Sequence, residues 1–101
     1  MTPPNLEGVD RIIHEPARLM IMAVLYVVTS ADFTFLMAQM GLSWGNLSSH
    51  MSKLEEAGYI QVVKDFAERR PHTMLRLTEA GRAAFREYRK TMKQVLDDLP
   101  D

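Results

Sequence analysis

Several features common in proteins are missing from this chain, and each absence excludes a class of function. Its 101 residues contain no cysteine, which excludes disulfides, thiolate metal sites and thiol redox sensing within it. No apolar run approaches the roughly 20 residues that cross a bilayer. The start, MTPPNLEGVD, has neither the basic nor the apolar segment of a secretion signal. Together these absences favour a cytoplasmic protein with no membrane partner.

An excess of charge of one sign is also missing. The chain has 12 Lys and Arg against 13 Asp and Glu, a formal net charge of -1. Any binding of nucleic acid must therefore come from a local arrangement of cations. With 47% apolar and 25% charged residues, the composition is that of an ordinary globular protein. We expect a flexible lead-in over residues 1–8 and a single domain over residues 9–101.

The first half of the chain predicts helices. Residues 17–28 are apolar with hardly a polar face, which predicts a central buried helix with Pro16 in its first turn. The apolar positions at helical spacing are Leu19, Met20, Ala23, Val24 and Val27.

Two further helices with a short connection follow. Thr34 is expected to cap a helix over 35–40 that ends at Gly41. Ser43 is expected to cap the next helix, 43–57. Two short helices joined by GLS are the pattern of a helix-turn-helix.

The periodicity changes after Gly58. The runs YIQVVKDF and TMLRL are rich in β-branched and aromatic residues and predict a hairpin, joined by the charged loop AERRPH. Thr78 is expected to cap a long last helix behind it. The apolar stripe of that helix consists of Phe85, Tyr88, Met92, Val95 and Leu99.

The helix 43–57 has two different faces. Leu47, Met51 and Leu54 share one face and are expected in the core. The rest of its surface carries small polar groups and one tryptophan: Trp44, Gly45, Asn46, Ser48, Ser49, Ser52 and Lys53. Small polar groups let a helix enter the major groove of DNA, and its N-terminus with Ser43 favours a phosphate. The alternative is an ordinary solvated face.

The loop FAERRPHT is a second candidate for DNA contact. Two adjacent arginines at a hairpin tip cannot be well buried, so folding does not explain them. The planar guanidinium of Arg69 or Arg70 suits phosphate oxygens. Lys64, His72 and Arg76 add donors along the strands. The alternative is a solvated turn with a local pair between Glu68 and an arginine, worth little energetically.

The histidines and serines indicate neither a metal site nor an enzyme. His14, His50 and His72 lie in three different predicted elements without ligand spacing. Ser48 and Ser49 precede His50 on a single helix, which cannot arrange a nucleophile and a base. We expect a partly buried imidazole or a phosphate contact for His50, and no catalytic residue and no cofactor anywhere.

The last helix indicates a homodimer. Its far half, from Met92 onward, needs a partner to cover its apolar side, and the first turns of the chain are its natural complement. The expected interface residues are Leu6, Val9, Ile12, Ile13, Tyr88, Met92, Val95, Leu96 and Leu99. A monomer whose terminal helix packs on its own chain is the alternative. Eight methionines would make such an interface adaptable, and able to accommodate a ligand.

Four stretches together resemble the small stand-alone winged-helix transcriptional regulators related to the multiple-antibiotic-resistance (MarR) and arsenical-resistance (ArsR) families. They are HEPARLMIMAVL, ADFTFL, GLSWGNLSSHMSKLEEAGYI and RRPHTMLRLTEAGRAAF, within about residues 9–90. The resemblance implies a mainly α, α+β fold: a winged helix-turn-helix with a two- to three-stranded wing sheet and a long C-terminal dimerisation helix. It implies a homodimer with the recognition helix 43–57 in the major groove. The wing 66–72 would lie over the backbone or the minor groove.

The resemblance also suggests roles for single residues. The full set expected to contact DNA is Ser43, Trp44, Gly45, Asn46, Ser48, Ser49, His50, Lys53, Lys64, Arg69, Arg70 and His72. Trp44 departs from the family because a small polar residue is usual there, so we expect it to stack on a sugar or a thymine methyl. The cysteine ligands of the arsenical-resistance group are missing, and metal sensing cannot be carried over.

These observations predict a regulator that binds a pseudo-palindromic operator in double-stranded DNA, and family precedent favours a repressor. Two alternatives stay open. The first is a winged-helix adaptor module that binds protein and not DNA. The second is a sensor that releases DNA when a small apolar effector enters the methionine-lined interface.

Overall fold

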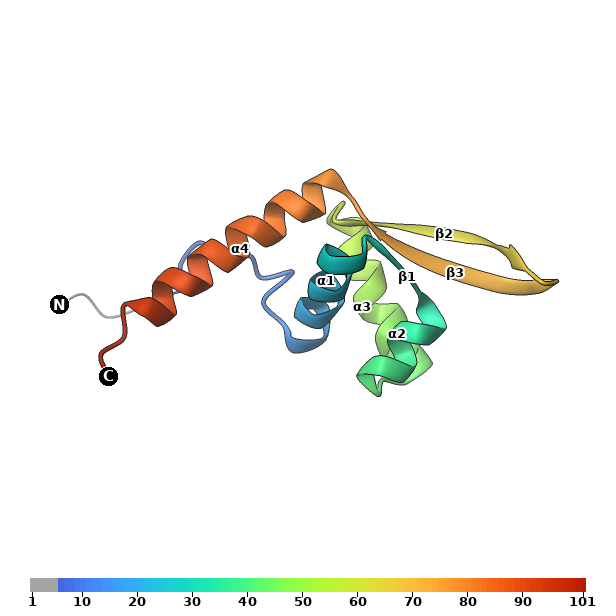
Figure 1. Ribbon diagram of the computed structural model, residues 1–101, viewed down its shortest axis with the longest axis horizontal. Helices are drawn as coiled ribbons and strands as arrows, with labels where there is room; N and C mark the ends of the chain where they lie inside the picture. Colours follow the sequence, from blue (N-terminus) through green and yellow to red (C-terminus); the bar gives the residue numbers. More distant parts are fainter. Residues whose placement is uncertain (1–5) are drawn as a thin grey trace.

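The computed structural model describes residues 6–101 (Figure 1), so residues 1–5 of the expected lead-in lie outside the described residues. The elements in chain order are α1 (Pro16–Val28), β1 (Ser30–Asp32), α2 (Phe33–Met40), α3 (Trp44–Glu56), β2 (Ile60–Ala67), β3 (Arg70–Leu77) and α4 (Glu79–Asp97). Over residues 6–101, four helices and a three-stranded antiparallel sheet form a winged helix, and this confirms the predicted fold class.

The sheet has three strands, within the two to three that the resemblance implied, but the sequence pattern did not locate the third. Its strand order is β1-β3-β2, and β1 was not expected as a strand. The prediction of a six-residue loop between the other two strands is wrong. β2 and β3 stay paired up to Ala67 and Arg70, so only Glu68 and Arg69 form the turn. Both turn residues have positive φ, 52° and 66°, as a two-residue hairpin turn of type I′ requires.

The proline of the wing fits inside β3 for a geometric reason. The pair that closes a two-residue turn is hydrogen-bonded, and pairs alternate along an antiparallel ladder. Pro71, opposite Phe66, is therefore in a non-hydrogen-bonded pair and needs no N–H toward β2. On its other side β1 reaches only from Met74 to Arg76 of β3, so no ladder bond is lost there.

Helix α1 buries one face only. Ile21, Met22 and Leu25 are buried in the core, whereas Met20 is 51% and Val27 82% exposed. The prediction that this helix is buried on all sides is wrong. The apolar surface of α1 is larger than the area that α3, α4 and the sheet cover, so some of its apolar side chains face solvent.

Capping side chains fix the ends of the helices. Ser43 and Thr78 cap α3 and α4 as predicted. The cap of α2 is Asp32 and not Thr34, because Asp32 Oδ1 accepts a hydrogen bond from the backbone N–H of Phe35 at 3.0 Å. The helix therefore begins two residues earlier than expected, directly at the end of β1, and Thr34 lies inside its first turn.

A carboxylate ties the N-terminal segment to the base of the hairpin. Asp10 Oδ1 accepts from the backbone N–H groups of Ile12 and Ile13. The hydroxyl of Tyr59 donates to Asp10 Oδ2 at 2.5 Å. This hydrogen bond, with burial and the carboxylate charge, raises the pKa of Tyr59 to about 12.

The chain is elongated, measuring 60 × 26 × 21 Å. Two parts project from the body that α1, α2, α3 and the base of the sheet form (Figure 1). The wing, β2 with β3, extends at one end, and the C-terminal half of α4 extends at the other. Within residues 6–101, no helix has both the length and the apolar character needed to cross a bilayer.

Candidate nucleic-acid interface

Helix α3 presents a face of short polar side chains to solvent. Leu47, Met51 and Leu54 are buried, as their spacing predicted. The exposed residues of its remaining surface include Gly45, Asn46, Ser49, Ser52 and Lys53, and Ser48 is half-buried. Ser43 Oγ accepts from the backbone N–H of Asn46 at 3.1 Å, which holds the first turn in place. The positive end of the helix dipole thus lies beside an open, slim polar surface.

Trp44 has a packing role that the sequence did not suggest. Its ring lies 6.1 Å from the ring of Phe33, centroid to centroid, at a tilt of 56°. Phe33 is buried at the start of α2, so Trp44 covers the junction between the two helices of the helix-turn-helix. The indole is nevertheless 67% exposed, which leaves most of its surface available for stacking.

His50 is engaged by residues of α1 and its cap. Its Nδ1 lies 3.1 Å from Arg18 Nη1 and 3.4 Å from Glu15 Oε2. Burial raises the pKa of Glu15, but the backbone N–H groups of Arg18 and Ala17 and the nearby His50 and Arg18 outweigh it. The pKa of Glu15 therefore lies below its ordinary value. His50 joins the middle of α3 to the N-terminus of α1.

The wing presents an aromatic side chain that was not predicted as a site residue. Residues directly opposite each other in a ladder share a face. Lys64 opposite Thr73, and Phe66 opposite Pro71, continue the face on which Leu75 is buried against the helices. Phe66 is 77% exposed. Only the pairing with Pro71, which a sequence does not reveal, shows on which side it lies.

The cations of the wing lie at its tip. Arg69 occupies the turn and Arg70 begins β3, and both are exposed. Arg70 shares the second face of the hairpin with Asp65 and His72, since these residues alternate with Phe66 and Pro71.

His72 lies between two carboxylates. Its Nε2 contacts Asp32 Oδ2, and its Nδ1 lies 3.3 Å from Asp65 Oδ1. Because Asp32 also caps α2, His72 connects the wing to the helix-turn-helix. His72 was expected to contact DNA, and here its two ring nitrogens contact carboxylates of its own chain.

The sequence pattern of the winged helix DNA-binding domain family matches residues 17–96, which include every element from α1 to nearly the end of α4. The chain belongs to this family. Winged-helix domains of this kind form a DNA-binding fold and not a class of enzymes.

Known proteins agree with this assignment. The winged-helix chain is 35% identical over 78 residues to an uncharacterised protein of Methanocaldococcus jannaschii, covering 77% of this chain and 85% of that protein. It is 33% identical to a transcriptional regulator homologue of Pyrococcus horikoshii OT3, whose structure superposes with a TM-score of 0.83 over 89% of this chain and 91% of that one. The structure of reduced AbfR bound to DNA shares the fold at 16% identity, with a TM-score of 0.64 over 82% of this chain and 57% of AbfR.

The winged-helix chain places its expected interface residues in different environments. Val9, Ile13 and Tyr88 are buried within its own core, and the Tyr88 hydroxyl lies 2.9 Å from His14 Nδ1. These three therefore have little surface left for a partner. Half-buried residues of the set are Ile12, Met92 and Val95, and exposed ones are Leu6, Leu96 and Leu99.

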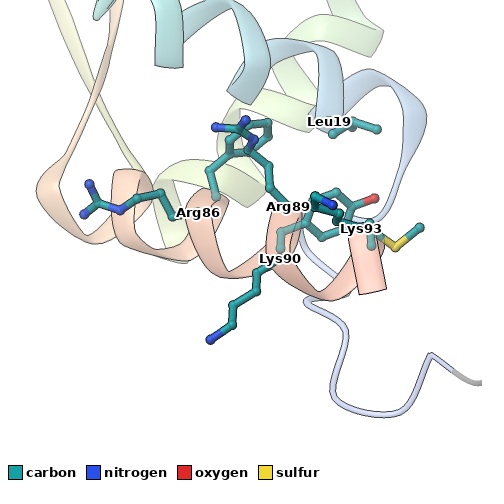
Figure 2. Close-up of a pocket in the computed structure, with 8 residues that line it drawn as sticks. Leu19, Arg86, Arg89, Lys90 and Lys93 are labelled. Carbon is teal, nitrogen blue, oxygen red and sulfur yellow. The ribbon is translucent and has the colours of Figure 1, made fainter. Parts of the chain in front are cut away.

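Two open grooves flank α1 of the winged helix. One, of about 790 Å³, lies between α1, α2 and α3 and is lined by Met20, Val24, Met40, Leu42, Asn46 and His50 among others. The other, of about 510 Å³, lies between α1 and α4 and has a basic rim. Figure 2 shows Arg86, Arg89, Lys90 and Lys93 along α4, and Leu19 on the α1 side of the groove.

The three histidines do not converge. His14 contacts Tyr88, His50 contacts Arg18 and Glu15, and His72 lies on the wing. Among residues 6–101, no three histidine or acidic side chains are grouped as a metal ion requires.

Proposed function

We propose that this protein is a sequence-specific regulator of transcription that binds double-stranded DNA as a homodimer, with α3 in the major groove and the wing on the backbone or the minor groove. One observation carries the proposal. The exposed surface of the first turns of α3 carries glycine, asparagine and serine side chains beside Trp44, and the wing ends in two exposed arginines.

The surface of α3 suits a groove better than it suits water. Serine and asparagine are mediocre helix formers because their side chains compete for backbone groups. A major groove about 12 Å wide admits a helix with short side chains, and hydroxyl and amide groups read the edges of bases. Asn46 and Ser49 are exposed near the N-terminal end of α3, where recognition helices make base contacts.

The wing supports the same proposal through its backbone strain. Glu68 and Arg69 both adopt positive φ, a conformation that Asn and Gly adopt at lower cost. An arginine at such a position lowers stability, so its presence there favours a function, and a phosphate is the partner that its planar fork suits.

Assembly and regulation belong to the proposal as well. Leu96 in the last turn of α4 and Leu99 just beyond its end are exposed, which supports a dimer through this helix. The MarR-like relatives support a regulatory role, and repression is the mode that family precedent favours.

The salt dependence of binding tests the wing. Each phosphate contact contributes about 0.9 to the slope of log K against log salt, so Arg69→Ala with Arg70→Ala should lower the slope by about one to two units and weaken binding to all sequences alike. Gel shifts with DNA from the protein's own upstream region measure this. Arg69→Lys with Arg70→Lys keeps both charges and should keep the slope. An unchanged slope in the double alanine variant would show that the wing does not touch phosphate.

The same assay separates the adaptor alternative. Phosphate attraction is strongest at low salt. If the wild-type protein shifts no DNA at low salt, this result contradicts DNA binding and favours the adaptor module.

A response to a small apolar molecule is a second candidate function. The groove of about 790 Å³ is lined by methionine and leucine side chains and reaches Asn46 and His50 on α3, so a molecule bound there would touch the proposed recognition helix. A ligand that binds the folded state must raise the melting temperature. Thermal shift with a panel of apolar compounds, followed by gel shift of those that bind, tests this function.

A further inference from the structure

We propose that Phe66 is an apolar wedge of the wing, which enters the minor groove of DNA and partly unstacks a base step there. The wing then selects DNA by how easily it deforms, in addition to binding its phosphates. This inference rests on the proposed DNA binding and adds to it a contact residue and a source of sequence preference.

The ring of Phe66 is presented to solvent close to the tip of the wing. It is 77% exposed, and one pair, Ala67 with Arg70, separates it from the turn. β2 is an edge strand of the sheet, so the ring lies at an outer border of the wing. Its cross-strand partner Pro71 is exposed as well. The two side chains form one apolar surface beyond the core, which indicates contact with another molecule.

The surroundings of this apolar surface suit a polyanion. A hollow of about 190 Å³ lies beside the ring, lined by Lys64, Asp65, Phe66, Pro71, His72 and Thr73. Lys64 and Thr73 form the next pair on the face of Phe66, so this face carries an ammonium and a hydroxyl group as donors. The carboxylate of Asp65 belongs to the other face, where His72 contacts it. Phosphates on either side of a groove would therefore find donors beside the ring.

The face that carries Phe66 lies on the helix side of the sheet. Closer to the body, Leu75 is buried on this face and Val62 packs against the core. Further out the wing projects past α2 and α3 (Figure 1), and the face is open to solvent at Phe66. A duplex held by α3 also extends on the helix side of the sheet, so it meets Phe66 and Lys64 before it meets Asp65.

An apolar wedge reads a property of the minor groove that hydrogen bonds read poorly. The groove is about 6 Å wide and shows nearly the same acceptors for A·T and T·A pairs. Phenylalanine and proline are among the side chains that wedge between base pairs there and kink the duplex. Pyrimidine–purine steps such as TA unstack easily, whereas A-tracts are stiff. Arginine alone favours the opposite sequence, because the narrow groove of an A-tract attracts cations.

Two duplexes that differ only under the wing test the wedge. Each carries the site that footprinting locates in the protein's own upstream region, with TATA or AAAA at the outer edge of each half-site. Gel shifts with wild type should show at least about tenfold tighter binding to the TATA duplex. Phe66→Thr should remove this preference by weakening binding to TATA alone. Phe66→Leu keeps an apolar side chain and should retain part of the preference.

Val63 provides a matched control on the same strand. It is 39% exposed and lies on the opposite face of β2, so Val63→Thr should keep the preference for TATA. Threonine suits a strand, and circular dichroism checks that all variants are folded.

Unstacking is measured directly with 2-aminopurine, whose fluorescence increases when it leaves the base stack. Placed at the adenine of a TA step, it should brighten when wild type binds. It should stay dark when the Phe66→Thr variant binds.

Other results would overturn the inference. If Phe66→Thr weakens binding to both duplexes equally and 2-aminopurine stays dark with wild type, the ring packs on sugars and enters no base step. If Phe66→Thr weakens binding to neither duplex, Phe66 lies outside the interface, while DNA binding through α3 and the arginines stands. If wild type shifts neither duplex even at low salt, the proposed DNA binding fails and the wedge fails with it.

Discussion

Two glycines near the N-termini of helices have opposite surroundings. A Cβ on Gly81 would overlap the backbone carbonyl oxygen of Tyr59 and lie 2.9 Å from Cδ1 of Leu77, because α4 starts directly against the hairpin base. A Cβ on Gly45 would meet no atom within 4 Å. The first glycine allows close packing within the chain, and the second keeps the exposed surface of α3 slim.

Substituting each glycine by alanine should therefore have opposite effects on stability. Gly81→Ala should lower the free energy of unfolding by about 2–3 kcal/mol, since overpacking exceeds the gain in helix propensity. Gly45→Ala should raise it by a few tenths up to about 1 kcal/mol. Urea unfolding measures both. A neutral Gly81→Ala would show that the hairpin base shifts freely away from α4.

The Gly45 variant also tests the DNA interface without a loss of stability. If α3 approaches the groove closely, the added methyl should weaken operator binding in gel shifts although the protein is more stable. Operator affinity equal to wild type would place Gly45 outside the interface.

At the scale of elements, the wing turn combines strain with charge. Glu68 and Arg69 both have positive φ, which costs a residue other than glycine about 1 kcal/mol or more. The turn places Arg69 at the furthest point of the wing, next to Arg70. The two turn positions are those at which a two-residue hairpin most strongly prefers asparagine or glycine, so Glu68 and Arg69 are unfavourable for folding there.

Two substitutions separate folding from function in this turn. Glu68→Asn should stabilise the chain by about 0.5 kcal/mol, because asparagine tolerates the left-handed region, and should keep or raise DNA affinity, since it removes a carboxylate from the wing. Arg69→Gly should stabilise it by a similar amount or more but weaken DNA binding. Thermal melts and gel shifts measure the two effects. If the Arg69→Gly variant keeps full DNA affinity, the arginine at this strained position does not contribute to DNA binding.

The elements that the sequence predicted are those with local signals. Ser43 and Thr78 are recognised as caps from their own neighbourhood, and the spacing of Leu47, Met51 and Leu54 defines the buried face of α3. The existence of these helices and of the hairpin can be predicted from such local signals alone.

Features that depend on pairing with distant residues were missed. β1 is a strand only because β3 lies beside it, and Asp32 caps α2 from the end of that strand. The position of Phe66 on its face follows from its register with Pro71, and the contacts of His72 with Asp32 and Asp65 require three elements to meet. Similarly, Val9, Ile13 and Tyr88 belong to the core of their own chain, which apolar spacing cannot distinguish from an interface.

At the scale of the whole molecule, charge is near balance but unevenly placed. Cations gather at the wing tip and along α4, and carboxylates gather at the C-terminal end, where Asp97 pairs with Lys93. The wing and the end of α4 project from opposite ends of the elongated body (Figure 1). A dimer joined through α4 therefore carries its two wings far from the two-fold axis, which suits two separate half-sites on DNA.

The spacing of the half-sites is the corresponding prediction. Two recognition helices related by a two-fold axis bind half-sites about one helical turn, roughly 34 Å, apart on one face of the duplex. Inserting five base pairs between the half-sites turns them to opposite faces, so that only one subunit can bind. Gel shifts should then show affinity reduced by about a hundredfold or more, since the second contact no longer benefits from a high effective concentration.

The control is DNA that carries a single half-site, and it should bind as weakly as the operator with the five-base-pair insertion. A variant designed to dimerise poorly, Leu96→Asp with Leu99→Asp at the exposed leucines, should bind the intact operator and the single half-site with more similar affinity than wild type does. Operator affinity that is insensitive to the insertion would mean that each subunit binds independently. In that case the dimer, however its α4 helices pair, would not set the geometry of DNA recognition.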